Sequence, residues 1–277
     1  MSNREITLGH SPDPDDAFMF YALAEDKLDT GGLTFRHIIQ DIETLNRRAM
    51  NAELDVTAIS IHAYAYVLDQ YALLTSGSSM GDNYGPLVVA RKPMSVDDLN
   101  KATIAVPGLM TTAYLALRLC IGEAKTVVVP FDQIMDSVER GDVEAGLLIH
   151  EGQLTYSARG FVKVIDLGEW WMSKTGLPLP LGGNAIKKSL GPELIDRVST
   201  LLRESIEYGL EHRGVAVRHS MKYGRGMEES LTDEFVGMYV NDYTIEYGER
   251  GREAVRLLLE QGHKAGIIPR PVQLEFV

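Results

Sequence analysis

An imidazole and a carboxylate stand side by side at His150-Glu151, directly after the apolar run 143–149. The run is short and lies between Gly141 and Gly152, which is typical of a buried β-strand. His150 would then follow the carboxyl end of that strand, where open α/β sheets bind their ligands. An imidazole there could act as a general base near neutral pH, although a lone histidine beside an apolar run is more often a hydrogen-bonded core residue.

Three further turns combine polar side chains with the expected start of a helix. These pairs are Ser11 with Asp16, Ser60 with His62, and Thr111 with Thr112. The N–H groups at helix N-termini attract anions, and hydroxyls there can add donors. Each turn alone is weak evidence, because Ser and Thr are also the commonest N-caps. Together with His150, the turns predict a pocket that holds a carboxylated small molecule beside one acid/base group.

Strand and helix patterns alternate along most of the chain, which predicts an α/β fold. Strands are expected at 6–10, 33–39, 55–60, 73–75, 86–90, 103–106, 125–129, 143–149 and 161–167. Helices are expected at 17–28, 42–51, 63–71, 113–121, 133–140, 192–213, 233–239 and 251–262. The side chains of Asp13 and Asp41 are expected to cap the first two of these helices.

The chain restarts after Arg91-Lys92-Pro93, near residue 92, and again near residue 178, in a segment rich in Pro and Gly. Two such crossovers predict a bilobed architecture with a discontinuous large α/β domain, 1–92 and 179–277. The intervening segment, 93–178, forms an inserted small α/β domain. This arrangement predicts an interdomain cleft, and clefts between domains favour small ligands.

The composition excludes several classes of partner. A formal net charge of −12 over 277 residues argues against nucleic acid or an anionic membrane, because phosphate binding needs clustered Lys and Arg. Cys120 is the only cysteine, so no internal disulfide can form. We expect a cytoplasmic protein without a metal site, because neither a secretory leader nor a set of metal ligands is recognisable. The C-terminal helices could bury a homodimer face.

Six strings of the sequence together resemble the 1,4-dihydroxy-6-naphthoate synthase family of the futalosine route to menaquinone. They are SPDPDDAFMFYAL (11–23), DIETLN (41–46), YGPLVVAR (84–91), VPGLMTTAYLAL (106–117), VEAGLLIHEGQLTY (143–156) and LGEWWMSKTGLPLPLGG (167–183). The resemblance implies a fold like that of the type II periplasmic binding proteins. It also implies a cofactor-free carbon–carbon lyase, which cleaves cyclic dehypoxanthine futalosine to 1,4-dihydroxy-6-naphthoate and releases the former sugar portion.

The resemblance also implies roles for single residues. His150 falls on the family's proposed general base, and Glu151 could orient its ring or point to solvent. Asp16 is a secondary candidate, which contacts ligand hydroxyls or locks its loop. The positions implied to contact substrate are Ser60, Ile61 and His62 on one turn and Thr111 and Thr112 on another, with Asn184 as a further candidate. Family members commonly carry Cys, Asn and Thr where this chain has Asp13, Asp15 and Ala17, so the role of the first loop stays open.

The sequence leaves two other functions open. Chorismate dehydratase, the sister enzyme of the same pathway, shares the fold and makes 3-enolpyruvylbenzoate, but it lacks the HEG-x-LTY string. A non-catalytic small-molecule binding protein would have the same cleft, with no turnover to lose when His150 is replaced.

Overall fold

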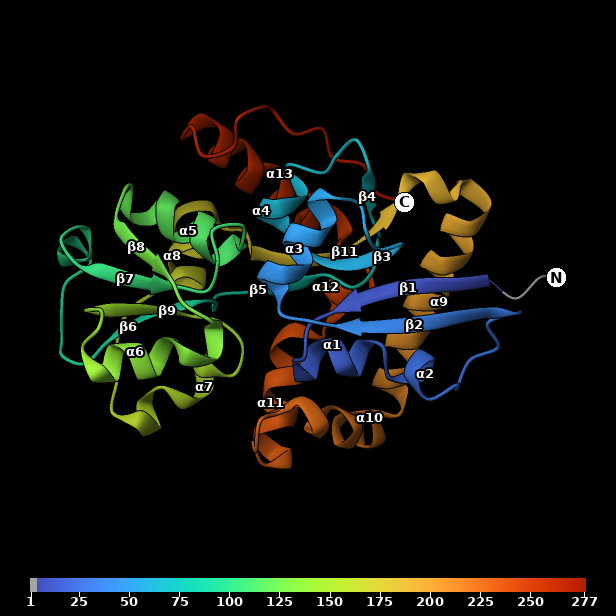
Figure 1. The fold of residues 1–277 in the computed structure, drawn as a ribbon, viewed down its shortest axis with the longest axis horizontal. Coiled ribbons are helices and arrows are strands. Elements are labelled where there is room, and N and C mark those ends of the chain that lie inside the picture. The colour runs from blue at the N-terminus through green and yellow to red at the C-terminus, as the bar shows by residue number, and fades with distance from the viewer. Residues whose placement is uncertain (1–3) are drawn as a thin grey trace. The chain divides into compact units, whose positions relative to one another are not determined.

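The computed structural model describes residues 4–277, which form two compact units (Figure 1). The first unit runs up to Ser79, resumes from Gly182 to Arg252 and includes Val272–Val277. The second unit comprises Met80–Leu181 and Glu253–Pro271. Each unit has a β-sheet with helices packed on it, so the predicted α/β class is confirmed.

The sheet of the first unit has the strand order β2-β1-β3-β11-β4, and β5 also pairs with β11. β1 runs parallel to β2 and β3, whereas β11 runs antiparallel to β3 and β4. Every residue of the central strand β3 is buried, as expected for a strand covered on both faces. The strands are β1 (Arg4–His10), β2 (Leu33–Ile39), β3 (Val56–Ser60), β4 (Tyr71–Leu73), β5 (Ser79–Gly81) and β11 (Leu179–Lys187).

Helices cover both faces of this sheet. Neighbouring residues of β1 point to opposite faces, and each face contacts a different helix. Leu8 packs in one apolar cluster with Phe18 of α1. On the other face, a Cβ at Gly9 would lie 3.0 Å from Cδ2 of Leu45, so α3 packs closely against β1 at this glycine. The helices are α1 (Pro14–Met19), α2 (Tyr21–Ala24), α3 (Ile42–Met50), α4 (Ile61–Tyr64), α9 (Pro192–Glu211), α10 (Arg213–Ser220), α11 (Glu229–Tyr239) and α12 (Asp242–Ile245).

The long helix α9 is held by an apolar stripe at the spacing the sequence predicts. Val198, Leu202 and Ile206 are each fully buried in the first unit's core. Burying one such side chain stabilises the fold by about 1.5–3 kcal/mol, so the stripe anchors α9 against the sheet.

The sheet of the second unit has the strand order β10-β6-β9-β7-β8. β7 runs parallel to β8 and β9, whereas β6 runs antiparallel to β9 and β10. The strands are β6 (Leu87–Ala90), β7 (Thr103–Val106), β8 (Lys125–Val128), β9 (Ala145–Leu148) and β10 (Val162–Asp166). Its helices are α5 (Thr112–Ile121), α6 (Ile134–Arg140), α7 (Gly152–Thr155) and α8 (Leu167–Thr175), and α13 (Gly248–Lys264) continues into this unit from the first. Short 3₁₀ turns lie at Asp97–Asn100, Phe131–Gln133, Ser157–Arg159, Lys188–Leu190 and Met221–Tyr223.

The structure corrects the predicted domain boundaries. Segment 80–92, expected in the larger domain, belongs to the second unit, because β6 pairs with β9 and β10. Residues from Glu253 onward in α13 also belong there, since Gly262 lies against Leu115 of α5. Segments distant in the sequence supply these contacts, so local composition gave no sign of either correction.

Several predicted elements are also wrong. The helix expected at 63–71 is the single turn α4, and the one expected at 17–28 is divided into α1 and α2. The Pro- and Gly-rich segment after residue 178 was expected to be a connection, but it forms β11. Proline is tolerated there because the ladder with β3 begins only at Gly182, beyond Pro180.

Candidate active site

His150 lies in the second unit, in the turn between β9 and α7. Its backbone has a φ of +57°, in the left-handed region. The amide of Gln153 donates to its carbonyl oxygen at 3.1 Å, and its ring packs edge-on against Phe131 at a centroid distance of 4.8 Å. A left-handed conformation costs a non-glycine residue roughly 1–2 kcal/mol, and such strained residues cluster at functional sites. The fold thus holds this imidazole at a fixed turn beyond a buried strand.

Thr111 and Thr112 begin helix α5 in the same unit. Thr111 is the N-cap, as expected: its Oγ1 accepts from the amide of Tyr114 at 3.2 Å and donates to the carbonyl of Gly108 at 2.9 Å. The Oγ1 of Thr112 donates to the carbonyl of Leu181 at 2.5 Å. A hydroxyl has one hydrogen to donate, and here both of these hydrogens are directed at backbone carbonyls. The backbone amides of the first turn are further donors suited to an anion, and the roles of Thr111 and Thr112 in substrate contact stay predictions.

Ser60 ends β3 in the first unit and is clamped by Asn46 of α3. The side-chain amide of Asn46 donates to Oγ of Ser60 at 2.9 Å, and its Oδ1 accepts from the Ser60 amide at 2.9 Å. Both residues are buried. The Ser60 side chain makes no helix-capping bond, and its oxygen already accepts a hydrogen, so its own hydrogen is directed elsewhere.

Asn184 lies on β11, on the same face of the sheet as Ser60. Gly182 pairs with Ser60 and Asn184 with Ala58, and residues two apart along a strand share a face. The side-chain nitrogen of Asn184 donates to the carbonyl of Gly77 at 3.2 Å. Its Oδ1 is buried and has no hydrogen-bond partner within residues 4–277. A buried acceptor left this way costs about 1–3 kcal/mol, so this position calls for a donor from a ligand or water.

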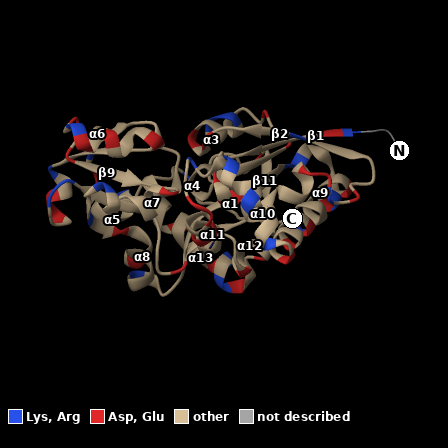
Figure 2. Ribbon diagram, turned by 90° about the horizontal axis from the view of Figure 1, so that it is seen from below, with Lys and Arg blue, Asp and Glu red and all other residues tan. Residues whose placement is uncertain are grey.

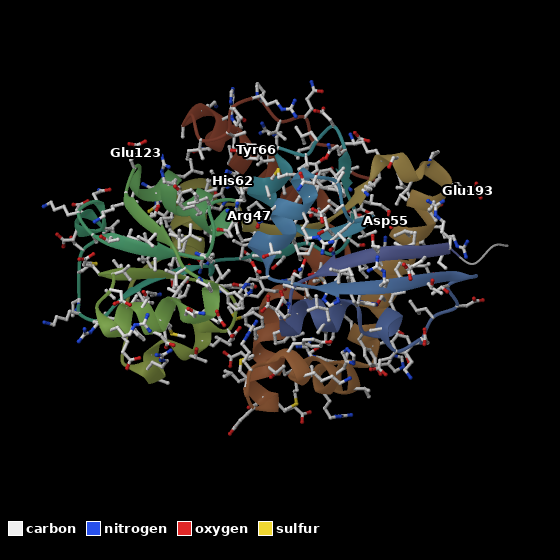
Figure 3. The ribbon with its side chains drawn as sticks, in the orientation of Figure 1. Arg47, Asp55, His62, Tyr66, Glu123 and Glu193 are labelled. Carbon is white, nitrogen blue, oxygen red and sulfur yellow. The ribbon has the colours of Figure 1, made fainter. Side chains whose placement is uncertain are left out.

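Ile61 and His62 follow Ser60 in α4. The side chain of Ile61 is fully buried, so only its backbone amide could meet a ligand. His62 is also buried, and its ring packs edge-on against Tyr66 at a centroid distance of 5.7 Å. Both residues are labelled in Figure 3. Their roles in substrate contact stay predictions.

The loop before α1 is held by its own acidic residues. Oδ2 of Asp16 accepts from the amide of Ser11 at 2.6 Å, which locks the loop. Asp13 stands at the N-cap position, but its carboxylate makes no capping bond, so that prediction is wrong. Instead, Asp13 accepts from the Ser11 hydroxyl at 2.5 Å and pairs with Arg225 at 3.2 Å. Asp41 does cap α3, by accepting from the amide of Thr44 at 3.0 Å.

Asn46 is the residue that sequence reasoning missed. The string DIETLN, on which the family resemblance partly rests, contains Asn46, but the sequence of this string indicates no role for it. Its function as a clamp depends on contact with Ser60, a residue of another element. The available signal was a fully buried polar residue at the inner face of α3, beside Leu45 and Ala49.

The remaining chemistry-bearing groups of the described residues offer neither a metal-binding cluster nor a reactive thiol. Among residues 4–277, no three His, Cys, Asp or Glu side chains are placed to hold a metal ion. Burial raises the pKa of Cys120 to about 11, so its thiol stays protonated at neutral pH. Figure 2 shows acidic and basic residues interspersed along α3 and α6. No helix in the described part of the chain has both the length and the apolar character needed to cross a membrane.

The two α/β units place the chain in the structural class of the periplasmic binding proteins. The alkanesulfonate-binding protein SsuA of Xanthomonas axonopodis pv. citri matches with a TM-score of 0.71 over 98% of this chain and 96% of that chain, at 10% identity. The protein CA3427 of Candida albicans, which has the same generic fold, matches with a TM-score of 0.70 over 96% and 91% of the two chains, at 13% identity. These similarities concern the fold alone.

Closer relatives identify the family. The model of the menaquinone biosynthesis family matches residues 6–264. The 1,4-dihydroxy-6-naphthoate synthases of Thermus thermophilus and Streptomyces coelicolor are 39% and 37% identical, over 96% and 97% of this chain and 98% and 96% of theirs. A crystal structure of an Archaeoglobus fulgidus protein matches with a TM-score of 0.92 at 46% identity, over 95% and 98% of the two chains. The chain therefore belongs to the menaquinone biosynthesis family and is an enzyme similar to the naphthoate synthases.

Proposed function

We propose that this protein is a 1,4-dihydroxy-6-naphthoate synthase, a lyase that cleaves cyclic dehypoxanthine futalosine without a metal or organic cofactor. The identity of 39% and 37% to two synthases, over nearly the full length of the chain, supports this reaction. The observation that carries the mechanism is the left-handed backbone of His150, two residues after the end of β9. A protein that only bound its ligand would have no need of a titrating side chain held at such a cost.

His150 is the proposed general base. Ring-opening elimination begins when a proton is removed from carbon, and a neutral imidazole is suited to accept it near pH 7. Edge-on packing against Phe131 and the bond from Gln153 to its carbonyl restrict this turn. Such restriction lowers the entropy lost when the base meets its substrate.

The first unit supplies the proposed polar contacts to substrate. The hydrogen of Ser60 and the unpartnered Oδ1 of Asn184 offer one donor and one acceptor on the same face of the sheet. That pair suits the hydroxyl groups of a sugar-derived substrate. In the second unit, taken by itself, the backbone amides at the start of α5 suit a carboxylate, since helix N-termini favour anions. Asp16 contributes by holding its loop.

The test is a product analysis with purified protein. After treatment with a chelator and gel filtration, the enzyme is incubated with cyclic dehypoxanthine futalosine or with chorismate. The proposal expects 1,4-dihydroxy-6-naphthoate from the first substrate only. Formation of 3-enolpyruvylbenzoate from chorismate would instead make the protein a dehydratase, and binding of either compound without turnover would make it a binding protein.

The matched variants are His150→Ala and His212→Ala. His212 is an exposed histidine of the first unit, stacked on Tyr208, and no proposed role falls on it. The proposal expects the first variant to lose activity and the second to keep it. Activity lost only after chelation, and restored by a metal ion, would contradict the cofactor-free reaction.

A further inference from the structure

A cavity of about 270 Å³ lies in the first unit, and its lining includes none of the residues proposed for catalysis or substrate contact. Its walls come from β1, β2, the helices α1 and α2, and the end of α10 with the turn that follows. None of Ser60, Asn184 and Asp16 lines it. The volume is just below the usual range for drug-sized ligands, so it could hold a molecule of one or two rings.

Three imidazoles line this cavity, and two of them form a chain whose tautomers can be assigned. Nδ1 of His10 lies 3.1 Å from the carbonyl oxygen of Ser11, which can only accept, so Nδ1 carries the hydrogen. Burial lowers the pKa of His10 to about 4, so the ring is neutral and its Nε2 is an acceptor. Nδ1 of His37, 3.0 Å from that Nε2, must therefore be the donor.

The chain ends at Nε2 of His37. Burial likewise lowers the pKa of His37 to about 4, so this second ring is neutral and its Nε2 is also an acceptor. That atom is buried and has no hydrogen-bond partner in the part of the chain that the structure describes. A buried acceptor in a cavity is completed by a donor from a bound molecule.

The charged groups at the cavity compensate one another. Glu25 pairs with Nδ1 of His219 at 3.0 Å and with Lys222 at 3.3 Å. The side chains of Glu25 and Lys222 are 41% and 59% exposed, whereas that of His219 is 9% exposed, so the cavity opens toward the carboxylate and the ammonium. With these charges paired at the opening, the interior selects neither an anion nor a cation.

The rest of the lining is apolar or aromatic. Phe20 lies 5.1 Å from the ring of His10, and Tyr223 and Ile39 complete the wall. Rings of this kind favour an aromatic partner in an offset or edge-on arrangement. We propose that the cavity is a second binding site, which takes a small uncharged aromatic molecule that donates one hydrogen bond, from O–H or N–H, to Nε2 of His37.

Phenol and anisole are suitable probes, because they share a ring and only phenol has a hydrogen to donate. Binding to the full-length protein is followed by NMR of ¹⁵N-labelled histidine rings. The proposal expects saturable binding of phenol, a shift of the His37 Nε2 signal, and roughly three- to tenfold weaker binding of anisole, the share that one hydrogen bond contributes. Equal affinity for the two probes, or no saturable binding of either, would overturn it.

Three variants separate the site from the fold. His37→Phe removes the acceptor and should weaken phenol binding by a similar factor, whereas His212→Phe, at an exposed histidine outside the cavity, should not. Ala24 is exposed and lines the cavity, so Ala24→Phe tests the site without disturbing the core, and it should abolish binding by filling the space. Unchanged phenol binding in Ala24→Phe, or a phenol-soaked crystal with only water in the cavity, would refute the site.

Discussion

Asn46 offers the sharpest test of how the first unit holds Ser60 in place. Its side chain makes two hydrogen bonds to Ser60, both 2.9 Å long and both buried. Asn46→Ala removes both and leaves the Ser60 amide without its acceptor. Two lost bonds of about 1 kcal/mol each, with a similar penalty for the stranded amide, predict a loss of about 2–4 kcal/mol in the free energy of unfolding. A domain stable by about 5–15 kcal/mol would still fold.

The catalytic effect of Asn46 should pass through Ser60, which makes Asn46 a positioning residue. If Ser60 donates one hydrogen bond to substrate, Ser60→Ala should lower kcat/KM by roughly three- to tenfold. Asn46→Ala should lower kcat/KM by a similar factor in the wild-type background. In the Ser60→Ala background it should lower kcat/KM little further, because the effects of residues that act as a unit are not additive.

The assay combines initial rates on cyclic dehypoxanthine futalosine with urea unfolding of the two single variants and the double variant. Asn51→Ala is the matched control, because Asn51 is exposed at the end of the same helix. An equal loss of kcat/KM in both backgrounds would refute the idea that Asn46 acts through Ser60.

Three further predictions concern stability and can be checked by urea unfolding. His150→Gly should be more stable than His150→Ala by about 1 kcal/mol, because glycine tolerates the φ of +57°; equal stabilities would mean that the turn relaxes without the imidazole. As pH falls from about 6.5 to about 4, His10 binds a proton in the unfolded chain but stays neutral while it is buried in the fold. The free energy of unfolding should therefore fall by about 3 kcal/mol through this residue. His10→Phe should lose that share and His212→Phe should not; an undiminished pH dependence in His10→Phe would contradict the assignment. Gly183→Ala should cost about 1–3 kcal/mol because its methyl group meets the buried Tyr247 hydroxyl, and adding Tyr247→Phe should restore part of the loss; no recovery would place the strain elsewhere.

The position of His150 could be predicted from the sequence, whereas its strained backbone could not. An apolar run followed by a polar pair is enough to place a residue after a buried strand, and β9 ends at Leu148, one residue before the predicted end at Ile149. The left-handed φ has no such pattern here, because a histidine in the sequence does not mark that conformation as a glycine would. That conformation depends on tertiary contacts such as the one with Phe131.

The partners of the other polar residues could not be predicted, because each contact joins distant segments. Thr112 donates to Leu181, a residue 69 positions away, and Asn184 to Gly77, 107 positions away. The strand β11 was hidden for the same reason: its Pro and Gly residues are typical of loops, and pairing with β3 overrides that preference. Local patterns fix the type of most elements, while the pairing of those elements decides which hydroxyls remain available to a ligand.

The central claim is that His150 removes the proton, and the most direct measurement is the single-turnover rate of His150→Ala beside its affinity for cyclic dehypoxanthine futalosine. We expect product formation to fall by about a hundredfold or more, the usual contribution of a general base, with binding largely retained. A variant that still turns over at near the wild-type rate, or an equal loss in His62→Ala with His150 dispensable, would contradict the assignment of the base.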